Sequence, residues 1–182
     1  YYFHTADLNL VRELLPVAEK IVQLFQSWRD EDGLVPDQEG PGVWNFIDWG
    51  YEQNNIALGG NTAPLNMLVA TAFRLTGLMH QAAGNESRGQ TLGQWSAETA
   101  TAMERHLWVE NDRHFRDCTA PKDGRETFSQ IPHALGLCYD LLASPVKQAA
   151  PEVLLNPEAV RAEFGYLLFV LDALSRNGRA DQ

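Results

Sequence analysis

Apolar residues spaced three and four apart are the feature that most restricts how this chain can fold, because that spacing puts them on one face of a helix. The clearest case follows Asp7, which is placed to cap the first helical turn. The helix that follows Asp7 is predicted to end near Trp28, ahead of a turn-forming Asp-Glu-Asp-Gly stretch at 30–33. No segment shows the alternating pattern of a half-buried strand. The sequence therefore predicts an all-α protein.

Further helices follow from the same spacing, and we expect them to pack as antiparallel neighbours in one domain, residues 1–182. Gly165 leaves open whether the last predicted helix is broken before the apolar run 166–174. The other predicted helices run from Thr62 to a stop at Gly84-Asn85, from Gln90 to Trp108 and from Phe128 to Ala143, and the last begins at Asn156-Pro157-Glu158.

Two connections, residues 29–61 and 109–127, are much longer than the others. Unstructured loops above about 15 residues are uncommon in compact domains and usually serve a function. Helical pairs stacked side by side place alternate loops on the same rim. The two long loops are therefore predicted to converge on one face.

The overall charge of the chain restricts the classes of partner that it can bind. The net charge is −10 over 182 residues and the basic residues are scattered, which argues against nucleic acid and anionic membrane surfaces. No apolar run approaches the about 20 residues needed to cross a bilayer, and no signal-peptide pattern opens the chain. The chain starts without methionine and directly in a helix pattern, so we expect a piece of a longer or processed protein, and its compartment stays undecided.

Cysteine and histidine positions give no metal or cofactor signature. Cys118 and Cys138 are too few for a disulfide framework and are expected to be packing residues. No two histidines have the spacing of three or four that binds metal on one helix, and no nucleotide-binding motif is present, so no cofactor is expected. His80 is predicted at a surface or helix flank. His133, close to Gln130 after a long loop, is a candidate to face a cleft.

The segment 42–50, GVWNFIDWG, concentrates aromatic residues outside any helical pattern. Its aromatic side chains allow two interpretations. They can plug the loop into the core, or they can form a floor on which a sugar ring stacks while Asp48 accepts hydrogen bonds from hydroxyls. The residues by themselves leave both open.

The order of motifs along the chain resembles the catalytic domain of the bacterial α-L-rhamnosidase family of glycoside hydrolases. The resemblance covers nearly the whole chain, from Tyr1 to Gly178, and WNFIDW carries most of it. The other motifs are Tyr-x-x-His-Thr-x-Asp at the start, DEDGLVPD, an Asn-x-x-x-x-Ala helix that ends at Gly84-Asn85, a helix that closes on HLW, then HFRDC and FSQIPHALGL.

The resemblance implies a fold, a reaction and site residues. The fold would be part of an (α/α)6 toroid of antiparallel helical hairpins. Asp48 and Trp49 would contact the sugar in its deepest subsite, with Trp44 as a nearby wall, and Gln130 and His133 would face the same rim. The family hydrolyses terminal α-L-rhamnosides with inversion, and its general acid and base would lie before and after this chain.

We therefore expect part of a carbohydrate-binding glycoside hydrolase domain that is inactive by itself. Two alternatives stay open: a non-catalytic helical carbohydrate-binding or interaction module, and a toroidal hydrolase for another sugar. An incomplete ring should also leave apolar helix flanks exposed at its open ends, so we expect self-association or marginal stability.

Overall fold

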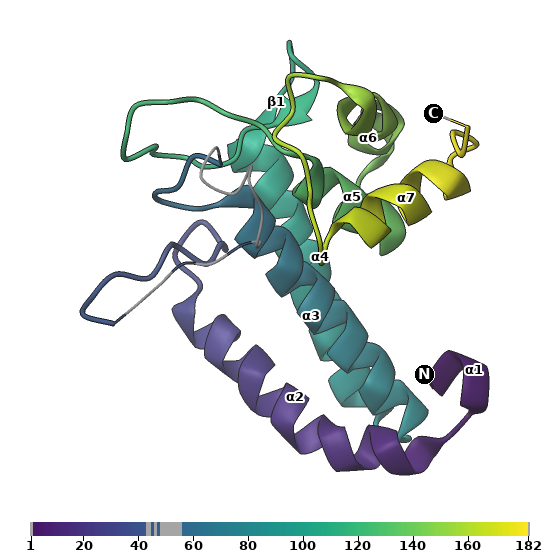
Figure 1. Ribbon diagram of the computed structural model, residues 1–182. Helices are drawn as coiled ribbons and strands as arrows, with labels where there is room; N and C mark the ends of the chain where they lie inside the picture. Colours follow the sequence, from purple (N-terminus) through teal and green to yellow (C-terminus); the bar gives the residue numbers. More distant parts are fainter. Residues whose placement is uncertain (1, 43–44, 46, 48–55, 182) are drawn as a thin grey trace.

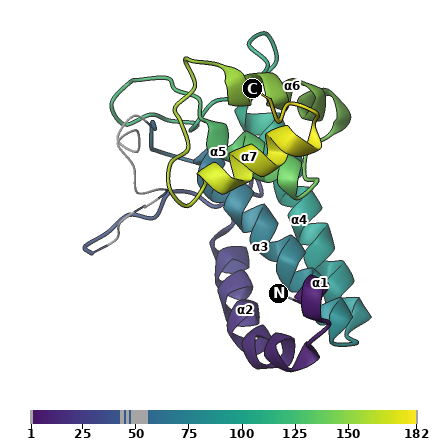
Figure 2. The ribbon, with the colours of Figure 1, turned by 45° about the vertical axis from the view of Figure 1, so that its right-hand side comes forward.

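The computed structural model describes residues 2–42, 45, 47 and 56–181. Three long helices lie side by side in it: α2 (Leu8–Trp28), α3 (Ala63–Ala82) and α4 (Glu86–Leu107). The short helix α1 (Tyr2–Thr5) precedes them. Above them lie α5 (Gln130–Cys138), α6 (Ser144–Leu155) and α7 (Leu167–Arg176), with α5 packed on α3 and α7 packed on α5 and α6 (Figures 1 and 2). The prediction of an all-α fold built from antiparallel helices is confirmed.

Capping chemistry sets the ends of the long helices. The carboxylate of Asp7 accepts a hydrogen bond from the Asn9 backbone N–H at 2.8 Å, which confirms the predicted cap of α2. Helix α3 begins directly after Thr62, close to the predicted start, with Pro64 in the first turn; the Thr62 hydroxyl donates to Asp37 and makes no cap hydrogen bond. Asn85 was expected to end α3, but its side chain also accepts from the Arg88 N–H and so caps α4. The connection between α3 and α4 is correspondingly tighter than predicted.

The second half of the chain departs from the predicted boundaries. Helix α5 ends at Cys138 and is followed by Asp140 in a left-handed conformation, so it is shorter than the predicted helix to Ala143. Helix α6 was not predicted; Pro145 lies in its first turn, where proline is tolerated, and Pro151 lies inside it. Asn156 follows the C-terminal end of α6 instead of beginning a helix.

A β-hairpin with two residues in each strand lies in the second long loop, which was expected to be a polar loop without strands. Its strands are β1 (Trp108–Val109) and β2 (His114–Phe115), which pair antiparallel with Trp108 opposite Phe115. The two rings meet edge to face with centroids 5.3 Å apart. The hairpin thereby carries the buried Phe115 into the core from a loop.

The helices enclose one large and one small apolar cluster. The large cluster joins α3, α4 and α5 through residues such as Met67, Met103 and Ile131. The small cluster joins α2 to α3 and α4 through Val22, Phe73 and Leu92. Burial of this apolar area is the main force that holds the helices together.

His80 lies in the contact between α2 and α3 and not at the predicted surface or helix flank. It is 8% exposed, and its Nε2 atom lies 2.9 Å from a carboxylate oxygen of Glu19. Arg88 of α4 donates to the other carboxylate oxygen of Glu19 from Nε and Nη2, at 3.0 and 2.5 Å. Burial by itself would raise the pKa of Glu19, but the hydrogen bonds from Arg88, His80 and Gln23 together lower it. Glu19 thereby ties α2 to α3 and α4.

Two helices keep apolar rows exposed, as expected of an incomplete ring. The outer face of α2 exposes Leu14, Val17, Ile21, Leu24 and Trp28. Around the start of α7 the exposed residues are Phe164, Leu167, Leu168 and Leu171. Helices α2 and α7 themselves lie on opposite sides of the helical array (Figure 1). Among the described helices, none is long and apolar enough to cross a membrane.

Candidate functional site

The two long loops meet along one rim of the molecule. The Thr119 N–H donates to the Asn61 carbonyl at 3.1 Å, and the Asn61 N–H donates to the Thr119 hydroxyl at 2.9 Å. Further along, the Ala57 N–H donates to the Thr127 hydroxyl at 2.8 Å. These contacts join residues about sixty positions apart in the sequence and confirm that the loops converge on one face.

Gly59 and Gly60 allow the loops to approach so closely. Both have positive φ angles, of 137° and 64°. A Cβ atom on Gly59 would collide with the carbonyl oxygen of Ala120, and one on Gly60 with the Thr119 hydroxyl. Only glycine fits both the backbone conformation and the space at these positions. This pair closes the rim by backbone contact.

Asp117 is the buried acid beneath the rim. Its carboxylate accepts hydrogen bonds from the Ser129 hydroxyl at 2.5 Å and the Thr127 hydroxyl at 2.6 Å. Its backbone carbonyl accepts from Ala63 N–H at the start of α3. Burial raises the pKa of Asp117 to about 6, although both hydroxyls act in the opposite direction. Asp117 is fully buried, so it holds the starts of α3 and α5 in place and does not itself reach solvent.

Asp37 is a second acid at this rim. It is 9% exposed, and one of its carboxylate oxygens accepts a 2.5 Å hydrogen bond from the Thr62 hydroxyl. Its other oxygen, Oδ2, is buried and has no hydrogen-bond partner among the described residues. The Asp37 N–H donates to the Gly60 carbonyl, which fixes the backbone between the two loops. Asp37 therefore has one carboxylate oxygen that can accept a hydrogen bond and that no described residue of the rim already uses.

The predicted sugar-contacting residues Trp44, Asp48 and Trp49 lie outside the described residues. Two other residues of the same motif are described. Asn45 exchanges two side-chain hydrogen bonds with the Gln38 backbone, at 3.2 and 2.9 Å. Ile47 is 6% exposed and packs in the large apolar cluster. The motif is therefore anchored to the domain at positions 45 and 47.

Gln130 and His133 both bind the backbone from inside the domain. Gln130 donates to the Leu154 carbonyl at 2.7 Å and accepts from the Ala162 N–H at 2.9 Å. His133 is fully buried, and its Nδ1 atom lies 2.8 Å from the Ser129 carbonyl. The contacts of Gln130 connect the start of α5 to the end of α6 and to the segment that follows it, whereas the His133 contact stays within the start of α5.

His133 is neutral in this environment. Its Nε2 atom accepts a hydrogen bond from the Phe115 N–H, so the proton is on Nδ1, where it is donated to Ser129. Burial lowers the pKa of His133 to about 4. A neutral imidazole that accepts at one nitrogen and donates at the other is a connector between β2 and α5.

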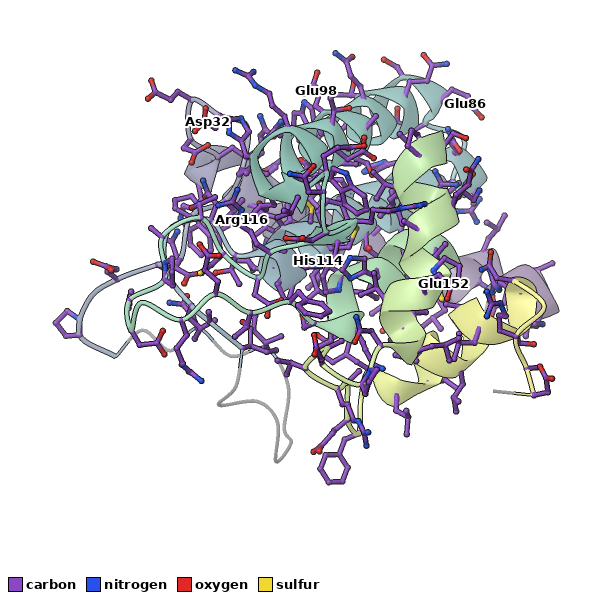
Figure 3. The ribbon with its side chains drawn as sticks, turned by 90° about the horizontal axis from the view of Figure 1, so that it is seen from above. Asp32, Glu86, Glu98, His114, Arg116 and Glu152 are labelled. Atoms are coloured by element: carbon purple, nitrogen blue, oxygen red, sulfur yellow. The ribbon has the colours of Figure 1, made fainter. Side chains whose placement is uncertain are left out.

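Hollows also lie beside the outer parts of the two long loops. One, of about 500 Å³, lies between the 30–33 turn and α4, where Asp32 and Glu98 line it (Figure 3). Another, of about 240 Å³, is lined by His114 of the hairpin and Glu152 of α6 (Figure 3). Over the described part of the chain, no cluster of three or more His, Cys, Asp or Glu residues could hold a metal ion.

Comparison with known proteins identifies the fold. No protein-family model and no curated protein sequence matches the chain. Among solved structures, it is similar to the GH78 family rhamnosidase of Bacillus sp. GL1, with a TM-score of 0.80 and 21% identity over 98% of this chain. It is also similar to a rhamnosidase from Klebsiella oxytoca with rhamnose bound, with a TM-score of 0.74 and 21% identity over 100% of this chain. This chain has the fold of part of a GH78 rhamnosidase.

The rhamnosidase-like fold accounts for the hairpin arrangement as part of an (α/α)6 toroid. The chain spans only 19% of the Bacillus protein and 33% of the Klebsiella protein. Sequence reasoning did not single out Asp37 and Asp117 as site residues. Both lie within motifs that carried the resemblance, DEDGLVPD and HFRDC, and their position inside those motifs was the available signal.

Proposed function

We propose that this chain is part of the catalytic domain of an α-L-rhamnosidase-like glycoside hydrolase, which cleaves terminal α-L-rhamnosides with inversion. The observation that carries the proposal is the similarity of the whole chain to two rhamnosidases, one of them with rhamnose bound. Residues 1–182 form one helical unit of that domain in this proposal. The bound partner is a carbohydrate, and no cofactor takes part.

Asp48 and Trp49 contact the sugar in this proposal, and Trp44 forms a nearby wall. Aromatic faces stack on the apolar face of a sugar ring, and a carboxylate accepts hydrogen bonds from its hydroxyls. The anchors at Asn45 and Ile47 support the proposal, because a binding segment must be held at fixed points if it is to be preorganised.

Gln130 and His133 support the sugar site from beneath in this proposal. Both side chains bind backbone atoms, and His133 is fully buried. They therefore position the loop that ends at α5, and the sugar contacts come from the rim above them.

Hydrolysis with inversion needs an acid and a base about 6.5–9.5 Å apart, on opposite faces of the sugar. Asp117 does not fit either role, because it is fully buried and both its carboxylate oxygens accept hydrogen bonds from hydroxyls. We assign both catalytic carboxyls to segments outside residues 1–182. The 182-residue chain is accordingly expected to bind rhamnose without hydrolysing an aryl α-L-rhamnoside.

The alternative function is a non-catalytic helical carbohydrate-binding module. The observation that favours it is that this chain spans 19% and 33% of the two matched rhamnosidases. A toroidal hydrolase for another sugar is the third candidate. The non-catalytic module differs from the main proposal in the activity of a longer protein that contains this chain. The hydrolase for another sugar differs in the ligand.

Titration of the chain with L-rhamnose, followed by tryptophan fluorescence and calorimetry, tests the sugar site. Binding is expected in the wild type, with Asp48→Ala and Trp49→Ala each weakening it at least tenfold. Trp28→Phe is the matched control, because Trp28 lies on the outer face of α2 and its loss should leave the affinity unchanged. D-glucose and D-glucuronate serve as competing sugars.

Absence of any response to L-rhamnose, or equal affinity in the Asp48→Ala and Trp49→Ala variants, would overturn the site assignment. Tighter binding of another sugar would favour the third candidate. A longer protein that contains this chain and hydrolyses an aryl rhamnoside would exclude the non-catalytic alternative.

A further inference from the structure

Two asparagine side chains hold the first long loop in the same way. Asn66 of α3 accepts a hydrogen bond from the Val35 N–H at 2.7 Å through Oδ1 and donates to the Val35 carbonyl at 2.9 Å through Nδ2. Asn45 repeats this pattern three residues further along, because its Oδ1 accepts from the Gln38 N–H and its Nδ2 donates to the Gln38 carbonyl. Each amide thereby pairs with both polar groups of one backbone residue, as a neighbouring strand would.

The pairing requires an amide at position 45. Its oxygen faces an N–H and its nitrogen faces a carbonyl, so the partner fixes the orientation of the amide. A carboxylate of the same size could still accept from the Gln38 N–H, but its second oxygen would face the Gln38 carbonyl and repel it. Aspartate at position 45 would therefore keep the shape of the side chain and remove one of the two bonds.

The Asn66 contact belongs to the buried part of the domain. Asn66 and Val35 are 0% and 1% exposed, and Nδ2 of Asn66 also donates to the Thr62 carbonyl at 3.0 Å, just before α3. Asp37 adds a bond to the same place, because its carboxylate accepts from the Thr62 hydroxyl. Segment 35–38 is thus fixed to the beginning of α3.

The Asn45 contact holds a more exposed part of the loop. Residues 39–42, which lie between the two partners, are exposed, and both glycines among them have positive φ angles. An ion pair between Glu39 and Lys122 also reaches this stretch, but both side chains are more than half exposed, and such pairs contribute little. Loss of the Asn45 amide would therefore release this stretch while the Asn66 contact stays in place.

We propose that Asn45 is a positioning residue for the carbohydrate site, an inference that rests on the proposed function. Its amide fastens the aromatic segment 42–50 to segment 35–38, which the buried part of the domain holds in place. Trp44 directly precedes Asn45, and the other two proposed sugar contacts follow within four residues. A binding segment that is fixed before the sugar arrives loses less conformational freedom on binding, so the affinity depends on this amide.

Calorimetric titration of the 182-residue chain with L-rhamnose tests the proposal. Asn45→Ala removes both bonds and Asn45→Asp removes one, so both should weaken binding, the alanine variant by roughly tenfold. Glu39→Gln is the matched control, because it breaks the surface ion pair of the same stretch and leaves the amide pairing intact. Its affinity for L-rhamnose should match that of the wild type.

Thermal unfolding and tryptophan quenching separate positioning from a general structural role. The unfolding temperature of Asn45→Ala should stay close to that of the wild type, whereas Asn66→Ala, which removes fully buried bonds, should lower it clearly. Acrylamide quenching of tryptophan fluorescence in the sugar-free chain should increase in Asn45→Ala, because Trp44 and Trp49 lie within four residues of that position. Quenching in Glu39→Gln should be unchanged.

Wild-type affinity in Asn45→Ala would overturn the proposal, and so would a fall in its unfolding temperature as large as that of Asn66→Ala. If the wild type itself does not bind L-rhamnose, the proposed function fails and quenching decides the role of Asn45. Unchanged quenching in Asn45→Ala would then overturn the positioning role too, whereas increased quenching would support Asn45 as the residue that orders the segment.

Discussion

The Nε2 atom of His133 in α5 accepts a hydrogen bond from the backbone N–H of Phe115 in β2, at 3.0 Å. The two rings also lie beside one another, with centroids 5.2 Å apart. Both residues are fully buried. A residue that sequence reasoning placed at a sugar-binding rim thus joins the second long loop to the helix that follows it.

Replacement of His133 by phenylalanine should destabilise the protein. The Phe115 N–H and the Ser129 carbonyl lose their partner, and a buried polar group left unpaired costs about 1–3 kcal/mol. The phenyl ring is also larger than the imidazole that it replaces, which adds crowding at a fully buried site. Urea denaturation followed by circular dichroism measures the change in the free energy of unfolding. The exposed His4→Ala variant is the control and should match the wild type.

The pH dependence of stability should show two opposed contributions from neighbouring residues. The pKa of His133 is lowered to about 4, so its contribution is complete above pH 6.5 and is lost as the pH falls toward 4. The pKa of Asp117 is raised to about 6, so its contribution is complete below pH 3.8 and is lost as the pH rises through 6. Each is worth about 3 kcal/mol at most.

Single variants should separate these contributions. In Asp117→Asn the free energy of unfolding should rise more steeply between pH 4 and 6.5 than in the wild type, because only the histidine contribution remains. In His133→Phe it should fall over that range relative to the wild type. Urea midpoints at a series of pH values measure both slopes, and unchanged slopes would show that neither group titrates as described.

Gly59→Ala should separate the two loops at the rim. Its Cβ would collide with the Ala120 carbonyl, and the positive φ angle adds strain, so a loss of about 2 kcal/mol or more is expected. Gly93→Ala is the control, because that position lies exposed in α4 with open space around it, and alanine there should stabilise the helix by about 1 kcal/mol. Thermal unfolding and hydrogen exchange at Asn61 measure the two effects. Equal stability of both variants would contradict the close packing.

Glu19→Gln should loosen α2 from the rest of the array. The change removes the charge that faces Arg88 and His80 while it keeps the shape, and a loss of about 1–3 kcal/mol is expected. Because the pKa of Glu19 is lowered, its contribution is complete above its ordinary pKa and is lost as the pH falls below it. Hydrogen exchange of the α2 amides measures the loosening. Glu13→Gln, on the exposed face, should leave α2 protected.

The sequence by itself determined the three long helices and the all-α class. Capping groups and first-turn prolines act within one turn of the chain, so Asp7 and Pro64 marked helix starts correctly. Local signals failed at α6, where Pro151 inside the segment is unfavourable for a helix that burial against α5 stabilises. Tertiary packing outweighs weak local propensity in such a segment.

Only the tertiary structure decided the partners of Asp117, His133 and Glu19. The hydrogen bonds that join these residues to other elements span 10 to 69 positions, and no local pattern records such a distance. The resemblance marked the correct fold, because the chain has the fold of part of a GH78 rhamnosidase at only 21% identity. Whether a polar side chain faces a ligand or the backbone depends on what packs against it in three dimensions, and for Gln130 and His133 the backbone is that partner.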